Sequence, residues 1–409
     1  QTNDLFFSPV SDKRQFDATS QAQDVALRLH ADTGSYIEYT YTLKPDNYIV
    51  NLSVNFVSLG GIIASNQSSL TLDWRMYVPQ KEKGRQNEDN YTTLKYKYYQ
   101  DEVDGFRERA NKDTETRDIA TRLTWIAYKD QFFSTVLIST DFFQNATVTS
   151  VPQDINSKYL RYFTSEAGVP FNVSSPQPVS MKLYYGPNHF RTLKDEGYEL
   201  EQLVMLGKNI TRWINQYLII PIFNWLNKYI GNYGLIILIL TLIIKIILFP
   251  LTFKSYQSQA KMAVLKPLVE EIGQKFPKRE DAMKKQQATM DLYKRAGINP
   301  MGGCLPLLLQ MPILFAMFRF FPTSIELRQE AFLWATDLST YDSILNLPFT
   351  IPLYGNHVSL FTILMTASTL LTMKMSGTSP GADQPGMKVM MYMMPVMFML
   401  ILNNFSSGL

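Results

Sequence analysis

The sequence predicts an α+β membrane protein: a β-sandwich followed by a helical transmembrane bundle that carries a helical hairpin. Two observations lead to this prediction. Residues 1–205 alternate polar and apolar side chains with the two-residue period of strands that have one face on a core. Residues 231–409 instead contain long uncharged apolar runs that are rich in Met and Phe.

Composition excludes several classes of protein. The net charge of +3 is too small to indicate a nucleic-acid partner. The single cysteine, Cys304, excludes an internal disulfide framework and a cysteine-rich metal site. The three histidines, His30, His189 and His357, are far apart in the sequence. We therefore expect no catalytic residues, no metal, no cofactor and no nucleic-acid binding.

Three runs in residues 1–205 show the strand pattern most clearly. The three runs are Tyr48 to Phe56, Leu70 to Val78, and Val179 to Tyr185. Each run places its apolar residues on one face. Many such runs, separated by turn signals, are typical of a β-sandwich. We expect this domain to be N-terminally incomplete.

Residues 206–231 change to a helical period. Apolar and aromatic side chains recur there on both sides of Pro221: Ile210, Trp213, Ile214, Tyr217, Leu218, Ile222, Trp225, Leu226 and Tyr229. Trp and Tyr are enriched where a protein meets lipid headgroups. The segment predicts an amphipathic interfacial helix that is kinked at Pro221. A helix that packs on the sandwich is the alternative.

Residues 232–409 predict four membrane spans. The apolar runs lie at about 232–253, 304–321, 359–375 and 389–403. At about 1.5 Å per residue, the first is long enough to cross a hydrocarbon core of about 30 Å. Each run alone fits a buried helix of a soluble protein, but four in succession predict a membrane domain.

The charges of the connecting segments orient these spans. Between the first two spans the basic residues are Lys254, Lys261, Lys266, Lys275, Lys278, Arg279, Lys284, Lys285, Lys294 and Arg295. The segment after the second span is acidic, with Glu326, Glu330, Asp337 and Asp342 against Arg328. Because Lys and Arg accumulate on cytoplasmic loops, the basic segment is predicted inside, and the β domain and acidic segment outside.

The basic segment, residues 254–298, predicts a cytoplasmic helical hairpin. Its first helix has an apolar seam at a three-to-four-residue spacing, formed by Met262, Leu265, Val269, Ile272 and Phe276. Pro267 is expected to kink this helix, and Pro277 to end it. A second helix is expected over about 281–296.

Lys245 is the main candidate for function. A cation inside an apolar span costs about 2.5–3.5 kcal/mol on insertion scales, so it is typical of a wet or paired site. Thr241 lies four residues earlier on the same helix face. Together with Gln310 they predict one wet face in the bundle. Two alternatives stay open: a snorkelling Lys245, and a Thr241 hydroxyl bonded within its own helix.

Several Pro- and Gly-containing strings resemble the YidC insertase family, in the family's order. They are Phe249-Pro250-Leu251-Thr252, Asn299-Pro300-Met301-Gly302-Gly303-Cys304-Leu305-Pro306, Gln310-Met311-Pro312-Ile313, Ile325-Glu326-Leu327-Arg328 and Met394-Pro395-Val396. The resemblance covers residues from about Gly231 to the end. Tyr184-Tyr185-Gly186-Pro187 also looks like the periplasmic domain of Gram-negative members.

The resemblance implies a membrane protein insertase and chaperone of the bacterial inner membrane, multi-pass, with a large periplasmic domain. Its expected partners are nascent membrane proteins, the Sec translocon, the ribosome and the lipid bilayer. Family members carry one positive residue in a hydrophilic groove, usually Arg, and that position is Lys245 here. Thr241 matches another groove position, and Met311 is the expected substrate contact. The last core span and the anchor before the outer domain are expected to be missing.

Two other function classes remain. A solute transporter or channel would use Lys245 as an anion site, although transporters usually show internal repeats, and we find none. A carbohydrate-active enzyme would need a placed pair of carboxylates. The cluster of Asp101, Glu102 and Asp104 is better explained as a solvated loop.

Overall fold

The computed structural model describes residues 2–64, 66–109, 112–172, 177–276, 281–298, 305–375 and 385–409. These residues form two compact units, Gln1–Val204 and Met205–Leu409. The predicted stop at Pro277 and the motif Asn299–Cys304 lie outside the described residues.

The first unit is a β-sandwich, which confirms the predicted fold of this region. Its strands are β1 (Ser8–Pro9), β2 (Gln23–Asp32), β3 (Ser35–Leu43), β4 (Ile49–Val57), β5 (Ser69–Pro79), β6 (Thr93–Tyr98), β7 (Val103–Gly105), β8 (Glu115–Ile119), β9 (Leu123–Lys129), β10 (Phe133–Phe143), β11 (Ala146–Pro152), β12 (Tyr159–Pro170) and β13 (Val179–Pro187). Short helical pieces are η1 (Thr2–Asp4), α1 (Arg85–Tyr91), α2 (Phe190–Glu196) and η2 (Leu200–Leu203).

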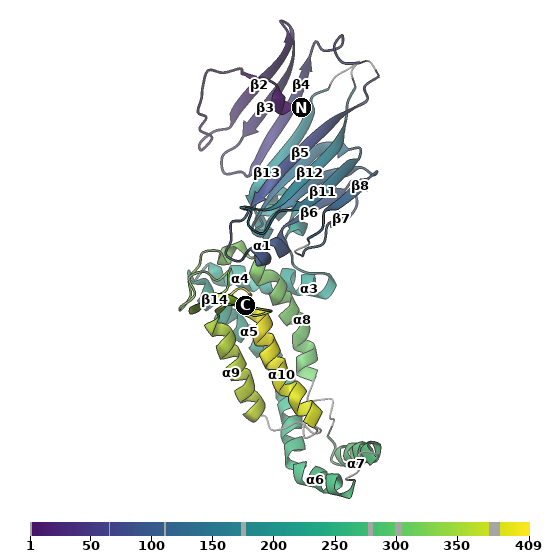
Figure 1. Ribbon diagram of the computed structural model, residues 1–409, viewed down its shortest axis with the longest axis vertical. Coiled ribbons are helices and arrows are strands. Elements are labelled where there is room, and N and C mark those ends of the chain that lie inside the picture. The colour runs from purple at the N-terminus through teal and green to yellow at the C-terminus, as the bar shows by residue number, and fades with distance from the viewer. Residues whose placement is uncertain are drawn as a thin grey trace. The chain divides into compact units, whose positions relative to one another are not determined.

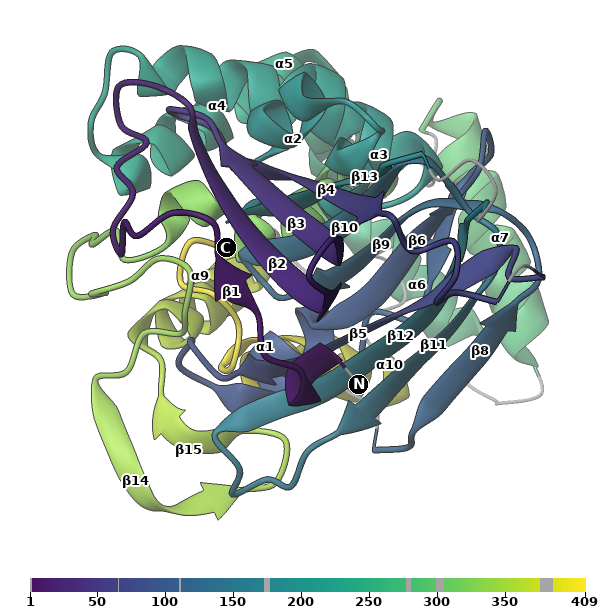
Figure 2. The ribbon, with the colours of Figure 1, turned by 90° about the horizontal axis from the view of Figure 1, so that it is seen from above.

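Two antiparallel sheets form the layers of the sandwich. One sheet has the order β1-β2-β3-β4-β13-β10-β9-β6-β7, and the other has the order β5-β12-β11-β8. Figure 2 shows the four strands of the second sheet along one side of the first. In the larger sheet Leu52 of β4 lies opposite Met181 of β13, and both side chains are buried. The alternating apolar residues of these strands therefore point into the core, where they remove apolar area from water.

Aromatic side chains join the two sheets. The rings of Trp74 on β5 and Tyr128 on β9 stack with centroids 3.9 Å apart. The Tyr128 hydroxyl donates to the Trp74 carbonyl at 2.7 Å and lies 2.8 Å from the Ser165 hydroxyl. Since Tyr128 is buried, these hydrogen bonds remove the cost of burying its polar end.

Two titratable side chains are buried in this unit, Glu88 of α1 and Lys129 of β9. Glu88 is buried, and its carboxylate accepts the backbone N–H of Lys81 at 3.0 Å and that of Glu82 at 3.1 Å. Burial, and then the negative charge of Asp130, raise the pKa of Glu88 to about 8. Lys129 is also buried, and burial lowers its pKa to about 8. Because burial disfavours the charged form of each side chain, the stability of the fold depends on pH.

We expect the stability of the β domain to pass through a minimum near pH 8. The folded-state pKa of Glu88 lies above its ordinary value of 4.5, so its contribution is complete below pH 4.5 and is lost as pH rises to about 8. The pKa of Lys129 lies below its ordinary value of 10.5, so its contribution is regained between about pH 8 and 10.5. The slope reaches at most about 1.4 kcal/mol per pH unit for one group.

Hydrogen exchange of strand β9, corrected for its intrinsic pH dependence, measures this effect. Glu88→Gln should flatten the slope between pH 5 and 8. Glu166→Gln, a change at an exposed carboxylate, should leave the slope as it is. An unchanged slope in Glu88→Gln would contradict the assignment.

The second unit is helical. Its elements are α3 (Asn209–Ile214), the π-helical η3 (Asn215–Ile219), α4 (Ile220–Asn227), α5 (Tyr233–Val264), α6 (Lys266–Lys275), α7 (Ala282–Arg295), α8 (Leu305–Phe320), η6 (Phe321–Thr323), η7 (Ile325–Leu327), β14 (Leu345–Ile351), β15 (Gly355–Val358), α9 (Leu360–Met375) and α10 (Pro385–Leu402). Within this unit α5 packs on α4 and α8, and α9 packs on α10 (Figure 1).

Among the described residues, one helix is long and apolar enough to cross a membrane. It is α5, judged by its length and composition, and 28% of its apolar window is buried. Shorter apolar helices cover Leu308–Thr323, Leu360–Lys374 and Tyr392–Leu402. α5 contains Pro250 in its interior and continues as one helix beyond Phe253, the predicted end of the first span.

The predicted interfacial segment forms α3, η3 and α4. Its large aromatic side chains Trp213, Tyr217, Trp225 and Tyr229 are exposed by 55–74%. Its other face is buried: the Asn215 amide donates to the carbonyls of Leu206 and Ala316, each at 2.9 Å. At the predicted kink, the irregular part of the segment is the π turn η3, which precedes Pro221. Pro221 itself stands in the first turn of α4, where a proline is tolerated.

The basic segment contains two helices that pack together. Met262 at the end of α5 forms a buried cluster with Tyr293 and Ile298, against which Leu265 and Val269 pack. The helix is interrupted at Leu265, and Pro267 stands in the first turn of α6, which begins at Lys266, instead of kinking one continuous helix. Ile272 on α6 and Phe276 after it are half-buried.

A buried polar junction, which sequence reasoning missed, joins the start of α9 to the end of α10. Asp342 accepts hydrogen bonds from the backbone N–H groups of Leu360 and Phe361 at 2.8 and 3.2 Å, and from the Ser359 hydroxyl. Asp342 therefore caps α9 from the preceding segment. At the end of α10, the Asn403 amide donates to the His357 carbonyl at 2.9 Å.

Candidate functional site

The candidate site lies where α5 meets α8. The Lys245 ammonium lies 3.4 Å from Oε1 of Gln310, and the two residues are 65 positions apart in the chain. Lys245 is exposed and Gln310 is half-buried. A charged donor thus meets an amide acceptor between helices whose other side chains are mostly apolar, and amide oxygens accept well from an ammonium.

Thr241 and Met311 flank this pair. Thr241 is half-buried one turn before Lys245, and its hydroxyl donates to the Ile237 carbonyl at 2.9 Å. This is the within-helix bond that the sequence left open for Thr241. Its oxygen still has a lone pair for another donor. Met311 follows Gln310 on α8 and is half-buried.

Two helix-interior prolines add polar backbone atoms to the same region. Pro250 in α5 and Pro312 in α8 have no N–H group. The carbonyls of Ile246 and Leu308, four residues earlier, therefore cannot receive the usual helical hydrogen bond. Ile246 follows Lys245 directly, and Leu308 lies two residues before Gln310. Both carbonyls are therefore hydrogen-bond acceptors that lie within two residues of Lys245 or Gln310 along their helices.

A hydroxyl-bearing face of α9 was not found from the sequence. Thr362 and Thr366 are buried and Thr369 is half-buried, at spacings of four and three residues. The three hydroxyls donate to carbonyls three or four residues earlier. The same i, i+4 rule that connected Thr241 to Lys245 is the signal that would have identified this face.

The described residues contain no candidate metal site. Within those ranges no group of three or more His, Cys, Asp or Glu side chains is placed to hold a metal ion. Asp104 pairs with Arg117 at 3.0 Å, an ordinary ion pair at a surface. At the candidate site itself the polar side chains are the Lys245 ammonium, the Gln310 amide and the Thr241 hydroxyl.

Comparison with known proteins places the chain in a class. The family model described as "60Kd inner membrane protein" matches residues 225–409, and that of the "YidC periplasmic domain" matches residues 1–221. The two matches define an inner-membrane protein with a periplasmic β domain. The chain belongs to the YidC membrane protein insertase family.

Curated relatives match along the whole chain. Proteins named "Membrane protein insertase YidC" are 47% identical in Parabacteroides distasonis and 44% identical in both Bacteroides fragilis and Phocaeicola vulgatus, and each alignment covers 100% of this chain. The chain spans 65–66% of the length of these relatives.

Proposed function

We propose that this chain is a membrane protein insertase and chaperone. It moves newly made membrane proteins into the inner membrane through a hydrophilic groove, alone or with the Sec translocon. The observation that carries the proposal is the contact between Lys245 and Gln310 across two apolar helices. Such a pair is costly in lipid, and it is stable where water or a polar chain reaches it.

The groove acts by lowering a desolvation barrier. A polar segment that enters lipid loses its hydration, at about 2.5–3.5 kcal/mol for a charged residue at mid-bilayer. Lys245, Gln310 and the proline-released carbonyls offer replacement partners at that depth. Lys245 also attracts acidic side chains of the arriving chain, although its ammonium lacks the two-pronged geometry of Arg. No bond is made or broken, so the mechanism needs no catalytic residue.

In this proposal α5, α8, α9 and α10 are the spans. The exposed aromatic side chains of α3 and α4 lie at the outer headgroups, as amphipathic interfacial helices do. The basic helices α6 and α7 lie in the cytoplasm, where they meet the ribosome or the translocon. On α10 the exposed side chains Met393, Met394, Met397 and Phe398 form a soft apolar surface for varied substrates.

Site-specific photocrosslinking during synthesis of a small membrane protein tests this function. Photoreactive residues at Thr241, Met311 and Phe398 should form crosslinks to the nascent chain, whereas one at Ile155, exposed in the β domain, serves as the control. If none of the three positions forms a crosslink to the nascent chain, the result contradicts the insertase. It then favours the transporter that uses Lys245 as an anion site.

A further inference from the structure

The hairpin β14–β15 exposes an unusual amount of apolar surface. Five large side chains in and beside it are exposed by 36–80%: Ile344, Leu345, Phe349, Ile351 and Leu353. No Asp, Glu, Lys or Arg occurs between Ser343 and Met373. Exposed apolar patches on soluble surfaces are usually small and bordered by charge, so this hairpin has the properties of a contact surface.

The turn of the hairpin and its second strand, β15, are held against the end of α10. The Asn403 amide donates to the carbonyls of Tyr354 and His357 at 2.8 and 2.9 Å, and the Asn404 amide donates to Tyr354 at 2.9 Å. The Ile344 N–H donates to the Val358 carbonyl at 3.0 Å. These bonds tie the turn and β15 to the end of α10, while the side chains of Leu345, Phe349 and Leu353 stay exposed. An isolated two-stranded hairpin is marginally stable in water, so the bonds to α10 help to hold this one in shape.

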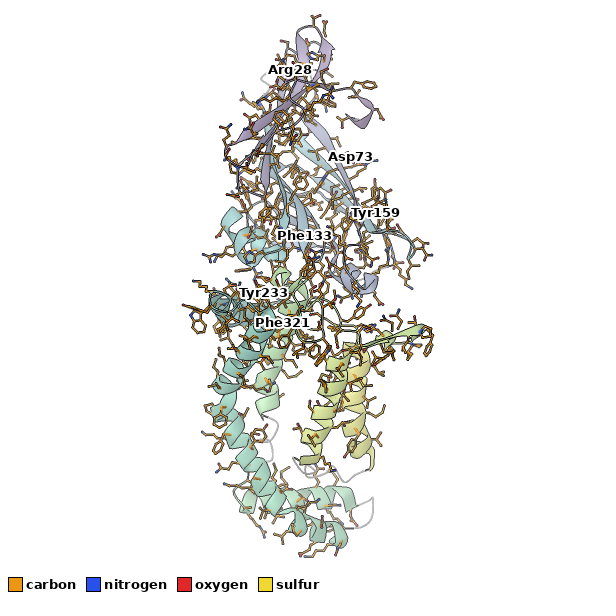
Figure 3. All side chains as sticks on the ribbon, turned by 90° about the vertical axis from the view of Figure 1, so that its left-hand side faces the viewer. Arg28, Asp73, Phe133, Tyr159, Tyr233 and Phe321 are labelled. Carbon is orange, nitrogen blue, oxygen red and sulfur yellow. The ribbon has the colours of Figure 1, made fainter. Side chains whose placement is uncertain are left out.

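The hairpin lies at the same end of the helical unit as the exposed aromatic residues. β15 leads directly into the first turn of α9, as α4 leads into the first turn of α5. Figure 3 shows the hairpin projecting sideways at this end, where Tyr233 and Phe321 are labelled, and Figure 2 shows β14 and β15 projecting away from α9. If α5 and α9 span the bilayer, the hairpin and the α3–α4 aromatic residues share one membrane surface.

We propose that β14–β15 is a second membrane anchor, which lies at headgroup depth in the outer leaflet of a phospholipid bilayer. This inference rests on the proposed function, because it requires α5 and α9 to be spans. An uncharged, apolar hairpin suits lipid better than a charged protein surface. Among the described strands, β14 and β15 pair only with each other, so the N–H and C=O groups on the outer edge of β14 need water. That need excludes the hydrocarbon centre and sets the depth.

Lipid-specific fluorescence quenching tests the anchor. The chain, with Cys304→Ser, is reconstituted in phosphatidylcholine–phosphatidylglycerol vesicles and labelled with an environment-sensitive dye at Leu353→Cys. Nitroxide lipids carry the quencher either near the glycerol or near the chain end. Leu242→Cys, exposed in the middle of the predicted span 232–253, is the control at depth, and Ile155→Cys, exposed in the β domain, is the control in water.

We expect the shallow quencher to reduce emission at Leu353→Cys about twofold and the deep quencher to have less effect, as for an interfacial side chain. Leu242→Cys should respond to the deep quencher, and Ile155→Cys to neither. An unquenched, water-like dye at position 353 overturns the anchor, and an unquenched but blue-shifted dye assigns the surface to protein instead. Loss of quenching at position 242 as well overturns the membrane bundle itself.

Discussion

Lys245→Ala should slow the insertion of substrates with charged exported segments on the order of tenfold, equivalent to about 1.4 kcal/mol of barrier. This is a fraction of the roughly 2.5–3.5 kcal/mol that a charge costs at mid-bilayer, because Gln310 and water still supply part of the solvation. Substrates with uncharged exported segments should insert at the normal rate. Insertion into proteoliposomes, followed by protease protection of the exported segment, measures the effect.

Two variants separate charge from position. Lys245→Arg keeps the cation and should retain activity; loss of activity there would show that Lys245 has a role beyond its charge. Lys254→Ala removes an equal charge nine residues further along α5 and should have little effect. Normal insertion of every tested substrate by Lys245→Ala would remove this residue from the mechanism.

Asp342→Ala should destabilise the helical unit by about 3–5 kcal/mol, because several donors lose their acceptor at about 1–3 kcal/mol for each buried group left unsatisfied. The carboxylate is only 4% exposed and also accepts the Trp334 indole N–H at 3.0 Å. Its removal leaves the first backbone N–H groups of α9 without their acceptor. Thermal unfolding in detergent should show a lower midpoint.

The size of the Asp342 effect depends on buried donors, so a conservative change serves as the comparison. Asp342→Asn keeps one acceptor oxygen and should fall between wild type and Ala. Glu271→Ala, at an exposed carboxylate on α6, should leave the midpoint unchanged. An Asp342→Ala midpoint equal to that of Glu271→Ala would show that the cap does not stabilise α9.

The sandwich was predictable because each strand carries its own signal. Alternation places Leu52 and Met181 inward whatever the order of the strands. The hairpin β14–β15 was missed because its strands hardly alternate and because Pro348, which disfavours a strand, lies inside β14. Asp342 was counted only as one acid of an outer segment, because its role as a cap depends on Leu360 and Phe361, which are distant in sequence.

The site was predictable in part. The cost of a cation in an apolar helix singles out Lys245 without any structure. Its contact with Gln310 depends on how α5 and α8 rotate against each other, and that is set by packing between residues far apart in sequence. For Thr241 the sequence allowed either a groove position or a bond within the helix; the structure contains that bond, and the groove role stays a prediction.

The water accessibility of position 241 tests the central claim most directly. In a Cys304→Ser background, Thr241→Cys is exposed to a membrane-impermeant maleimide in sealed inner-membrane vesicles whose cytoplasmic face is outward, with Lys254→Cys as the accessible control and Leu242→Cys as the lipid-facing control. A water-filled groove predicts that Thr241→Cys reacts from the cytoplasmic side while Leu242→Cys does not. An unreactive Thr241→Cys beside a reactive Lys254→Cys would mean a dry bundle and would contradict the account.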